Sequence, residues 1–572
     1  MTLYIIETVL FMIAAIGALL IGFEMLSNSI TMIFHSQLKK LFNKTSNSPI
    51  IGVLIGAAAT AIVQSSGATT IMIVGFVNTG IMNLFQATSM IMGANIGTTI
   101  TAQIASLSGG TGFDFGALAL GLTGIGALIT MFTKSEKFKS VGNLLAGLGL
   151  LFLGLECMSI AIGSTYNGEQ VIKESIKSIL ASPFVSEGML APFILFILGI
   201  VLTGITQSSS LITSIVITFV ANGIYIGAGS DATSLNNNVL FLILGSNIGS
   251  CVTALLSSMG ASKNAKRASI IHILFNTFGS IIFMIVLLLV PKLMESTFAK
   301  WFESPGSQIA MFHTFFNTVC TLIFLPFIKI FVKIASVLIK DKEEEVEGPG
   351  LVFVDERLLP TPSIAVHQVR KELGLMYSKA MNILNVSLDG FLNRDPSVRE
   401  EVDQVNDNLE ITNKLVIEYI VKLTSQQLVL EDESTISSFH RTLNDILRIG
   451  EIAENICKYT KQTVNNELVF SPNVTLHVGF MKNKINALYE KSDEVFMTKN
   501  ISKIAEADVI EEDIDLMRKQ MIDDHMERLK TKECSPQNSG VFVNLVNNME
   551  RAADHMIYIA YSVKEAKEQF HK

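Results

Sequence analysis

Two short polar clusters interrupt long apolar stretches of the sequence, and both carry the same residue types in the same order. Gln-Ser-Ser-Gly at 64–67 lies within the apolar stretch 50–80, and Gln-Ser-Ser-Ser at 207–210 lies within 190–222. Each half-segment is too short to cross a bilayer alone, since about 20 residues are needed. Half-helix N-termini at such breaks suit an oxyanion, whereas hydroxyl, amide and carbonyl oxygens suit Na⁺. The clusters are therefore candidate ligand sites.

The two clusters belong to an internal repeat. The segment at 20–27 corresponds to 152–159, and Gly-Ala-Asn-Ile-Gly-Thr-Thr at 93–99 corresponds to Gly-Ser-Asn-Ile-Gly-Ser at 245–250. Three motifs that recur in one order indicate a duplicated unit. Oxygen-bearing residues of these motifs form the predicted substrate and sodium site: Gln64, Ser65, Ser66, Asn95, Thr98, Thr99, Gln207, Ser208, Ser209, Ser210, Asn247 and Ser250.

These motifs allow two interpretations. Small residues and Ser/Thr also pack transmembrane helices together without any ligand. Four such motifs, paired by a repeat and placed at helix breaks, favour a substrate site over packing alone. No base or acid partner stands near either cluster, so the sequence predicts no catalytic serine and no enzyme.

Ionisable residues also recur within the apolar half. Glu24 and Glu156 are mid-helix carboxylates at matching positions of the repeat. Intramembrane ionisable residues are functional candidates, but each glutamate could equally bind serine or backbone groups where the two copies meet. The pairs His-x-x-x-Asn at 272–276 and 313–317 each share one helix face, and we interpret them as bracing groups between helices.

The uninterrupted apolar runs predict membrane crossings at 3–27, 84–107, 115–133, 141–163, 235–258, 268–290 and 307–333, and the two interrupted stretches predict re-entrant helical hairpins. With the C-terminus in the cytoplasm, the basic loops near 39–44, 134–139 and 263–267 all fall inside, as the positive-inside rule requires. An odd number of crossings then separates the two copies and inverts the second. Inverted repeats with discontinuous helices are typical of alternating-access carriers.

The composition changes near residue 340. Residues 1–340 carry 16 Lys and Arg against 11 Asp and Glu, whereas residues 341–572 carry 27 against 40. No nucleic-acid partner is predicted for so acidic a half. We predict a multi-pass domain of the cytoplasmic membrane at 1–340, followed by a linker at 341–362 and a cytoplasmic domain at 363–572. Within the first domain, repeat one spans about 3–133, repeat two about 141–290, and an extra helix 307–333.

The C-terminal half shows apolar residues at helical spacing in six segments: 363–390, 398–425, 434–461, 473–498, 502–530 and 537–568. Long helices with short connections indicate antiparallel bundles. The segment at 445–451 parallels 548–554, so we predict two three-helix bundles. The fold class of the whole chain is therefore all-α, a polytopic helical transporter with a soluble helical domain.

Residues 1–340 resemble the type II sodium–phosphate cotransporter family in its bacterial form. The resemblance is carried by the paired Gln-Ser-Ser motifs, the two Asn-Ile-Gly motifs and His-x-x-Phe-Asn at 272–276 and 313–317. It implies sodium-coupled uptake of inorganic phosphate, with the phosphate held by both Gln-Ser-Ser regions. One departure is Gly67, which stands where the second copy has Ser210 and so removes one hydroxyl ligand.

Residues 363–572, with Glu-Arg-Ala-Ala-Asp-His at 550–555, resemble the PhoU family of phosphate-signalling proteins. This resemblance implies a regulatory domain whose paired acids can bind a metal cluster, here Glu511, Asp515, Glu550 and Asp554. The alternative is a solvated acidic face. In the first half of this domain Leu447 replaces the expected acid. A homo-oligomer or a regulatory protein partner through this domain is left open.

The leading hypothesis from the sequence is a sodium–phosphate symporter in the lipid bilayer, with phosphate and Na⁺ as ligands and a cytoplasmic regulatory domain. Export under a different gradient is a variant of it. Two alternatives are a membrane-anchored phosphate sensor or adaptor that binds without transporting, and a sodium-coupled carrier of another oxyanion.

Overall fold

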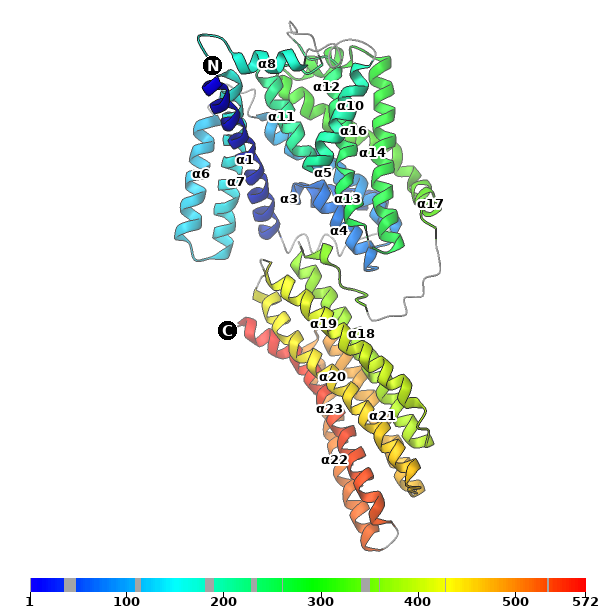
Figure 1. Cartoon of the computed structure of the whole chain (residues 1–572). Helices are drawn as coiled ribbons and strands as arrows, with labels where there is room; N and C mark the ends of the chain where they lie inside the picture. The colour runs from blue at the N-terminus through cyan, green and yellow to red at the C-terminus, as the bar shows by residue number, and fades with distance from the viewer. Residues whose placement is uncertain are drawn as a thin grey trace. The chain divides into compact units, whose positions relative to one another are not determined.

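The computed structural model describes residues 2–34, 48–107, 115–180, 190–227, 234–259, 261–340, 350–359, 361–426, 428, 430–531 and 534–571. The chain divides into two compact units, Met1–Lys342 and Glu343–Lys572 (Figure 1). Both units are built from helices, and the described residues form no strand. The predicted all-α fold class is confirmed.

The first copy of the repeat consists of a long helix, a broken hairpin and two further helices. These are α1 (Thr2–Ile33), α3 (Pro49–Val63), α4 (Ser66–Asn78), α5 (Leu84–Ser106) and α6 (Phe115–Phe132). The hairpin helices α3 and α4 have 15 and 13 residues, and the first polar cluster lies between them. The predicted break is therefore present, but the basic loop near 39–44 lies outside the described residues.

The second copy repeats this order with one added break. Its helices are α7 (Glu136–Gly163), α8 (Val171–Leu180), α10 (Ala191–Thr206), α11 (Ser209–Ala221), α12 (Asn238–Gly249), α13 (Cys251–Ser257) and α14 (Lys263–Leu289). The hairpin α10–α11 corresponds to α3–α4, and α12 with α13 takes the place of α5. A π-helical turn η2 (Met294–Phe298), α15 (Ala299–Trp301), α16 (Pro305–Phe324), a 3₁₀ turn η3 (Leu325–Phe327) and α17 (Ile328–Leu338) complete the unit.

Five helical segments among the described residues are long and apolar enough to cross a membrane: Leu3–Ile33, Lys137–Gly163, Asn238–Ser257, Lys263–Leu289 and Pro305–Leu338. Helices α3, α4, α6, α10 and α11 are shorter apolar helices. The predicted crossing at 84–107 forms α5, which is not among the five because Gln, Ser, Asn and Thr lower its hydropathy. Most of these polar residues are buried, so α5 faces protein rather than lipid.

Glycines allow each hairpin to lie against the neighbouring helix with the two backbones in contact. α3 packs on α5, and α10 packs on α12. A Cβ atom at Gly93 would lie 2.0 Å from the carbonyl oxygen of Val53, and one at Gly245 would lie 1.9 Å from that of Phe196. These glycines begin the motifs at 93–99 and 245–250. The motifs therefore act as packing surfaces that hold the hairpins in place.

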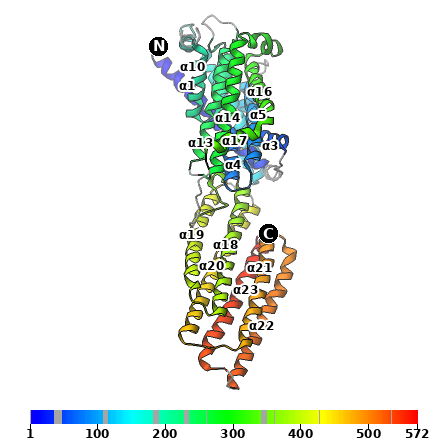
Figure 2. The ribbon, with the colours of Figure 1, turned by 90° about the vertical axis from the view of Figure 1, so that its right-hand side faces the viewer.

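The second unit contains α18 (Pro362–Asn393), α19 (Val398–Thr424), α20 (Leu430–Asn465), α21 (Pro472–Thr498), α22 (Ile504–Lys530) and α23 (Pro536–His571). Helices α18 to α20 pack with one another, as do α21 to α23, and α20 packs along α23. Figure 2 shows these six helices running alongside one another. The two predicted three-helix bundles are present, and the six predicted segments correspond to the six helices.

The segment that precedes α18 is bonded to its bundle. The backbone N–H groups of Val352 and Phe353 donate to Glu372 Oε2 at 2.9 and 2.6 Å. The hydroxyl of Tyr419 donates to the carbonyl of Asp355 at 3.0 Å. Within the linker predicted at 341–362, residues 350–359 thus form part of the helical unit, and residues 341–349 and 360 lie outside the described residues.

Replacing Gly93 with alanine should push α3 away from α5 and destabilise the first unit by roughly 1–3 kcal/mol, the range typical of overpacking. Gly121→Ala is the matched control, because a Cβ at this position of α6 meets nothing within 4 Å. The thermal unfolding midpoint of the purified protein in detergent measures both effects. Equal midpoints for the two variants would contradict the backbone contact.

Candidate substrate site

Both hairpins break at the same pair of residues and in the same backbone conformation. Gln64 and Gln207 adopt the left-handed conformation, with φ of 58° and 54°. The serine that follows each glutamine is extended. Non-glycine residues in left-handed backbone cost of order 1–3 kcal/mol and cluster at functional sites. Because the same conformation recurs after α3 and after α10, both hairpins break with one shared backbone geometry.

The serine after each glutamine caps the second half of its hairpin. Ser65 Oγ accepts a hydrogen bond from the Ala68 N–H, and Ser208 Oγ accepts one from the Leu211 N–H, both at 3.2 Å. A helix start has four N–H groups without a partner in the helix, so each cap satisfies only part of the set. The remaining N–H groups and the positive ends of the α4 and α11 dipoles favour an anion.

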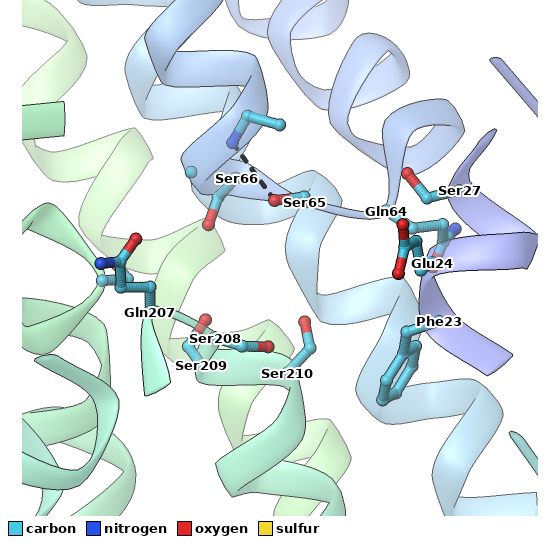
Figure 3. A pocket seen from close by; sticks show the side chains of 13 residues that line it. Phe23, Glu24, Ser27, Gln64, Ser65, Ser66, Gln207, Ser208, Ser209 and Ser210 are labelled. Carbon is cyan, nitrogen blue, oxygen red and sulfur yellow. Dashed lines mark hydrogen bonds between the residues drawn. The ribbon is translucent and has the colours of Figure 1, made fainter. Parts of the chain in front are cut away.

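A cavity of about 290 Å³ lies between the two breaks (Figure 3). It is lined by α1 (Phe23, Glu24 and Ser27), by the first break (64–68), by the second break (207–210) and by Ser250. The volume is at the small end of ligand pockets, which span ~300–1,000 Å³, and it suits a small ion. Each copy of the repeat thus supplies one side of a single pocket.

Most of the lining residues carry hydroxyl or amide groups, and one carries a carboxyl group. Among the described residues that line the cavity there is no Lys, Arg or His, and Glu24 is the acidic one. An anion here is held by hydroxyls and backbone N–H groups rather than by an ion pair. Two unit charges ~4 Å apart interact by about 4 kcal/mol at an effective dielectric constant of 20. An unneutralised carboxylate therefore opposes anion binding.

The two glutamines have different partners although their backbones match. Gln64 is buried, donates from Nε2 to the Ala61 carbonyl and accepts from Thr101 Oγ1 at 2.9 Å. Gln207 is exposed. Thr253 is the counterpart of Thr101, and its buried hydroxyl has no partner within the described part of the chain. The first copy therefore has a threonine–glutamine hydrogen bond that is absent between the equivalent residues of the second copy.

The serines on α1 and α7 show a related difference. Ser27 Oγ donates to the carbonyl of Val63, the last residue of α3, at 2.5 Å. Its counterpart Ser159 instead accepts from Asn222 Nδ2, just after α11, at 2.8 Å. Helix α1 packs against the first half of one hairpin, and α7 packs against the second half of the other. Consequently α1 lines the cavity and α7 does not.

Eight of the twelve predicted site residues line the cavity, and four do not: Asn95, Thr98, Thr99 and Asn247. The side chains of Asn95 and Thr99 donate to carbonyls of their own helix. The asparagine of the second motif donates from Nδ2 to Asn317 Oδ1 at 3.0 Å, and its Oδ1 lies 3.3 Å from His313 Nε2. This network braces α12 against α16, the role expected for the His and Asn pair.

Five lining residues are absent from the predicted site: Gly67 and Ala68 after the first break, and Phe23, Glu24 and Ser27 on α1. The three residues on α1 do have a signal in the sequence, because the segment 20–27 recurs at 152–159. The repeat does not reveal which of the two equivalent helices, α1 or α7, lines the cavity. Glu24 lines the cavity, whereas its counterpart Glu156 does not.

Comparison with known families agrees with this architecture. Residues 18–160 match the Na⁺/Pi-cotransporter family, and residues 373–460 and 478–563 match the PhoU domain. Residues 18–160 therefore belong to the Na⁺/Pi-cotransporter family, and the second unit contains a PhoU domain. The first unit is thus the transporter unit, and the second is the PhoU unit.

The transporter also has relatives in bacteria and in mammals. It is 22% identical over 566 residues to “Putative inorganic phosphate export protein YjbB” of Escherichia coli, which covers 98% of both chains. It is 28% identical over 328 residues to “Uncharacterized protein YqeW” of Bacillus subtilis, or 56% of this chain and 95% of that one. A stretch of 86 residues is 34% identical to human “Sodium-dependent phosphate transport protein 2B”, or 15% and 12% of the two chains. No solved structure matches the chain.

The acidic pairs of the PhoU unit lie near one another, but an arginine lies among them. Arg518 Nε is 3.3 Å from Glu550 Oε1. Among the residues with described positions, no group of three or more His, Cys, Asp or Glu side chains is placed to hold a metal ion. The metal cluster predicted at Glu511, Asp515, Glu550 and Asp554 is therefore not supported, because the guanidinium supplies positive charge that a metal ion would otherwise bring.

Replacing Thr101 with valine should remove the hydrogen bond to Gln64 and leave the buried amide oxygen of Gln64 unpaired, a loss of about 1–3 kcal/mol. Thr253→Val is the matched control, because this hydroxyl has no partner to lose. Thermal unfolding of both variants in detergent gives the comparison. A Thr253→Val loss as large as that of Thr101→Val would show that the two copies are equivalent in solution.

Glu511→Gln should stabilise the PhoU unit at pH 7.5 but not at pH 4. Burial, and then the neighbouring carboxylates of Asp515 and Asp554, raise the pKa of Glu511 above its ordinary value. The charged form is thus disfavoured in the folded state, and stability falls as pH rises through that raised pKa. Hydrogen–deuterium exchange of α22 and α23 in the full chain measures the effect.

The control for this charge removal is Asp523→Asn, an exposed position on the same helix whose charge is not among those that raise the pKa of Glu511. It should leave the exchange of α22 and α23 unchanged at both pH values. Slower exchange in both variants, or in Glu511→Gln at pH 4 as well, would show that the effect is not the relief of a buried charge.

Proposed function

We propose that this protein is a sodium-coupled carrier of inorganic phosphate that works by alternating access across the cytoplasmic membrane. The observation that carries the proposal is the cavity between the two broken hairpins, where two helix N-termini meet and no basic side chain stands among the described lining residues. In this proposal the transporter unit is multi-pass, and the PhoU unit is its cytoplasmic regulator.

The donor set of the cavity favours a small tetrahedral oxyanion. The hydroxyls of Ser66, Ser209 and Ser210 come from the first turns of α4 and α11, where backbone N–H groups also face an anion. Several donors from two directions suit an ion with several acceptor oxygens. Family membership and the phosphate in the relatives' names support phosphate among such ions.

The composition of the lining also supports coupling to sodium. The described lining residues include no Lys, Arg or His, and so they supply no fixed positive charge to balance an anion. Hydroxyl, amide and carboxylate oxygens are ligands that suit Na⁺. A cation bound beside the anion raises the affinity for the anion, and by linkage the anion raises the affinity for the cation by the same factor. The two ions then move together.

The inverted repeat supports an alternating mechanism. Helix α1 contacts the end of α3, whereas α7 contacts the end of α11. The two hairpins are thus held differently against equivalent helices. We propose that the hairpins move against these helices to open the cavity to one side of the membrane and then to the other.

Export is a second candidate for the direction of flux. The relative that shares both units along 98% of its length carries phosphate export in its printed name. The human relative named for sodium-dependent transport matches over 86 residues only. A carrier runs either way according to its gradients, so the pocket chemistry is the same for uptake and export.

Ser208→Ala should lower sodium-dependent phosphate transport at least tenfold, because it removes both the cap of α11 and a hydroxyl of the cavity. The measurement is radiolabelled phosphate flux in proteoliposomes under inward, outward and zero sodium gradients. Ser175→Ala on α8, whose side chain is exposed and bonds its own helix, is the control and should transport normally.

The same assay separates the alternatives. Phosphate binding without flux in the wild type would favour a sensor or adaptor, and inhibition by sulfate equal to that by phosphate would favour a carrier of other oxyanions. A phosphate flux that depends on the phosphate gradient and does not change with the sodium gradient would refute sodium coupling.

A further inference from the structure

One ionisable side chain stands among the described residues of the cavity, and anion binding does not explain its role. Glu24 lines the cavity from α1, whereas the rest of the lining is hydroxyl, amide, apolar or glycine. A carboxylate in a cavity for phosphate repels the substrate unless something neutralises it. No described cationic side chain lines the cavity to do so.

The surroundings of Glu24 are rich in oxygen atoms. Figure 3 shows Glu24, Ser27 and Gln64 gathered at one end of the cavity, with Gln207 at the opposite end and the serines between. Ser27 is one turn further along α1 and shares a face of that helix with Glu24. Carboxylate, hydroxyl and amide oxygens together form a set of ligands for a small hard cation.

The contact between α1 and α3 fixes the position of this carboxylate. Ser27 Oγ donates to the Val63 carbonyl at 2.5 Å, and Thr101 donates to the Gln64 side chain at 2.9 Å. These bonds hold α1 and the first break together, so Glu24 faces the cavity without having to move. The site is therefore formed before any ion arrives.

We propose that the Glu24 carboxylate binds a sodium ion at this end of the cavity and that this ion makes phosphate binding depend on sodium. The inference rests on the proposed function and adds the cation site to it. The bound Na⁺ cancels the charge of Glu24 and presents a positive charge to the phosphate, which lies between the N-termini of α4 and α11.

The described residues of the second copy form no equivalent site. Glu156 occupies the matching position on α7 but does not line the cavity. Ser159, the counterpart of Ser27, bonds to Asn222 instead of to the end of α10. The proposal therefore assigns one sodium ion to a carboxylate, at the end of the cavity formed by the first copy.

Equilibrium binding of radiolabelled phosphate to the full-length protein in detergent, at increasing Na⁺ and constant ionic strength, tests the proposal. The wild type should gain more than tenfold in phosphate affinity between sodium-free buffer and saturating Na⁺. Glu24→Gln should gain less than threefold, and its affinity in sodium-free buffer should equal or exceed that of the wild type. Glu156→Gln should keep the wild-type dependence.

Glu24→Asp is a second variant for the case that Glu24→Gln does not fold. It keeps the carboxylate but places it on a side chain that is one methylene group shorter. It should retain sodium dependence with a higher half-saturating Na⁺ concentration. Full sodium dependence in Glu24→Gln, or equal loss in Glu156→Gln, would overturn the proposal. A wild-type affinity that responds to pH but not to Na⁺ would also overturn it, by making Glu24 a proton site.

Binding of radioactive sodium in the absence of phosphate separates this inference from the proposed function. Sodium bound by the wild type and lost in Glu24→Gln, in a protein that binds no phosphate, would refute the function and leave the cation site standing. Phosphate bound with the same sodium dependence in both proteins would refute the cation site and leave the function standing.

Discussion

Backbone N–H groups that lose their helical partners within an apolar environment are the constraint on which this structure depends. Each unpaired polar group costs several kcal/mol in hydrocarbon, and each broken hairpin creates a new helix start with such groups. Ser65 and Ser208 satisfy one N–H group each. The others face a polar cavity, where an anion can satisfy them. The strained glutamines, the capping serines and the glycine contacts all serve to keep these two helix starts in place.

The duplication explains why the two sides of the pocket are similar, and tertiary contacts explain why they are not identical. Local sequence sets local backbone, so both glutamines adopt nearly the same φ. Their side chains meet different neighbours, because α1 contacts α3 while α7 contacts α11. A carrier needs two arrangements of similar energy, and a duplicated unit with unequal contacts in its two copies is a physical basis for them.

Much of the architecture follows from sequence because its signals are local. Polar clusters within apolar stretches locate the two breaks, and helical periodicity locates the six helices of the PhoU unit. The cavity residues at both breaks follow from the same signal. The sequence does not reveal which residues of α5 and α12 face the cavity. Asn95 and Asn247 lie in helices that protein buries on both their inner and outer faces, so burial does not distinguish a ligand from a packing residue. The choice of Glu24 over Glu156 and the position of Arg518 beside Glu550 depend on helix packing, which no short motif encodes.

In the proposed mechanism, one anion binds between the starts of α4 and α11. A structure determined with Na⁺ and arsenate, a heavier analogue of phosphate, would locate this anion, because anomalous scattering identifies the arsenic atom. We expect a single anomalous peak between the Ser65–Ser66 and Ser208–Ser210 segments. A peak elsewhere in the transporter unit, with this cavity holding only water, would contradict it.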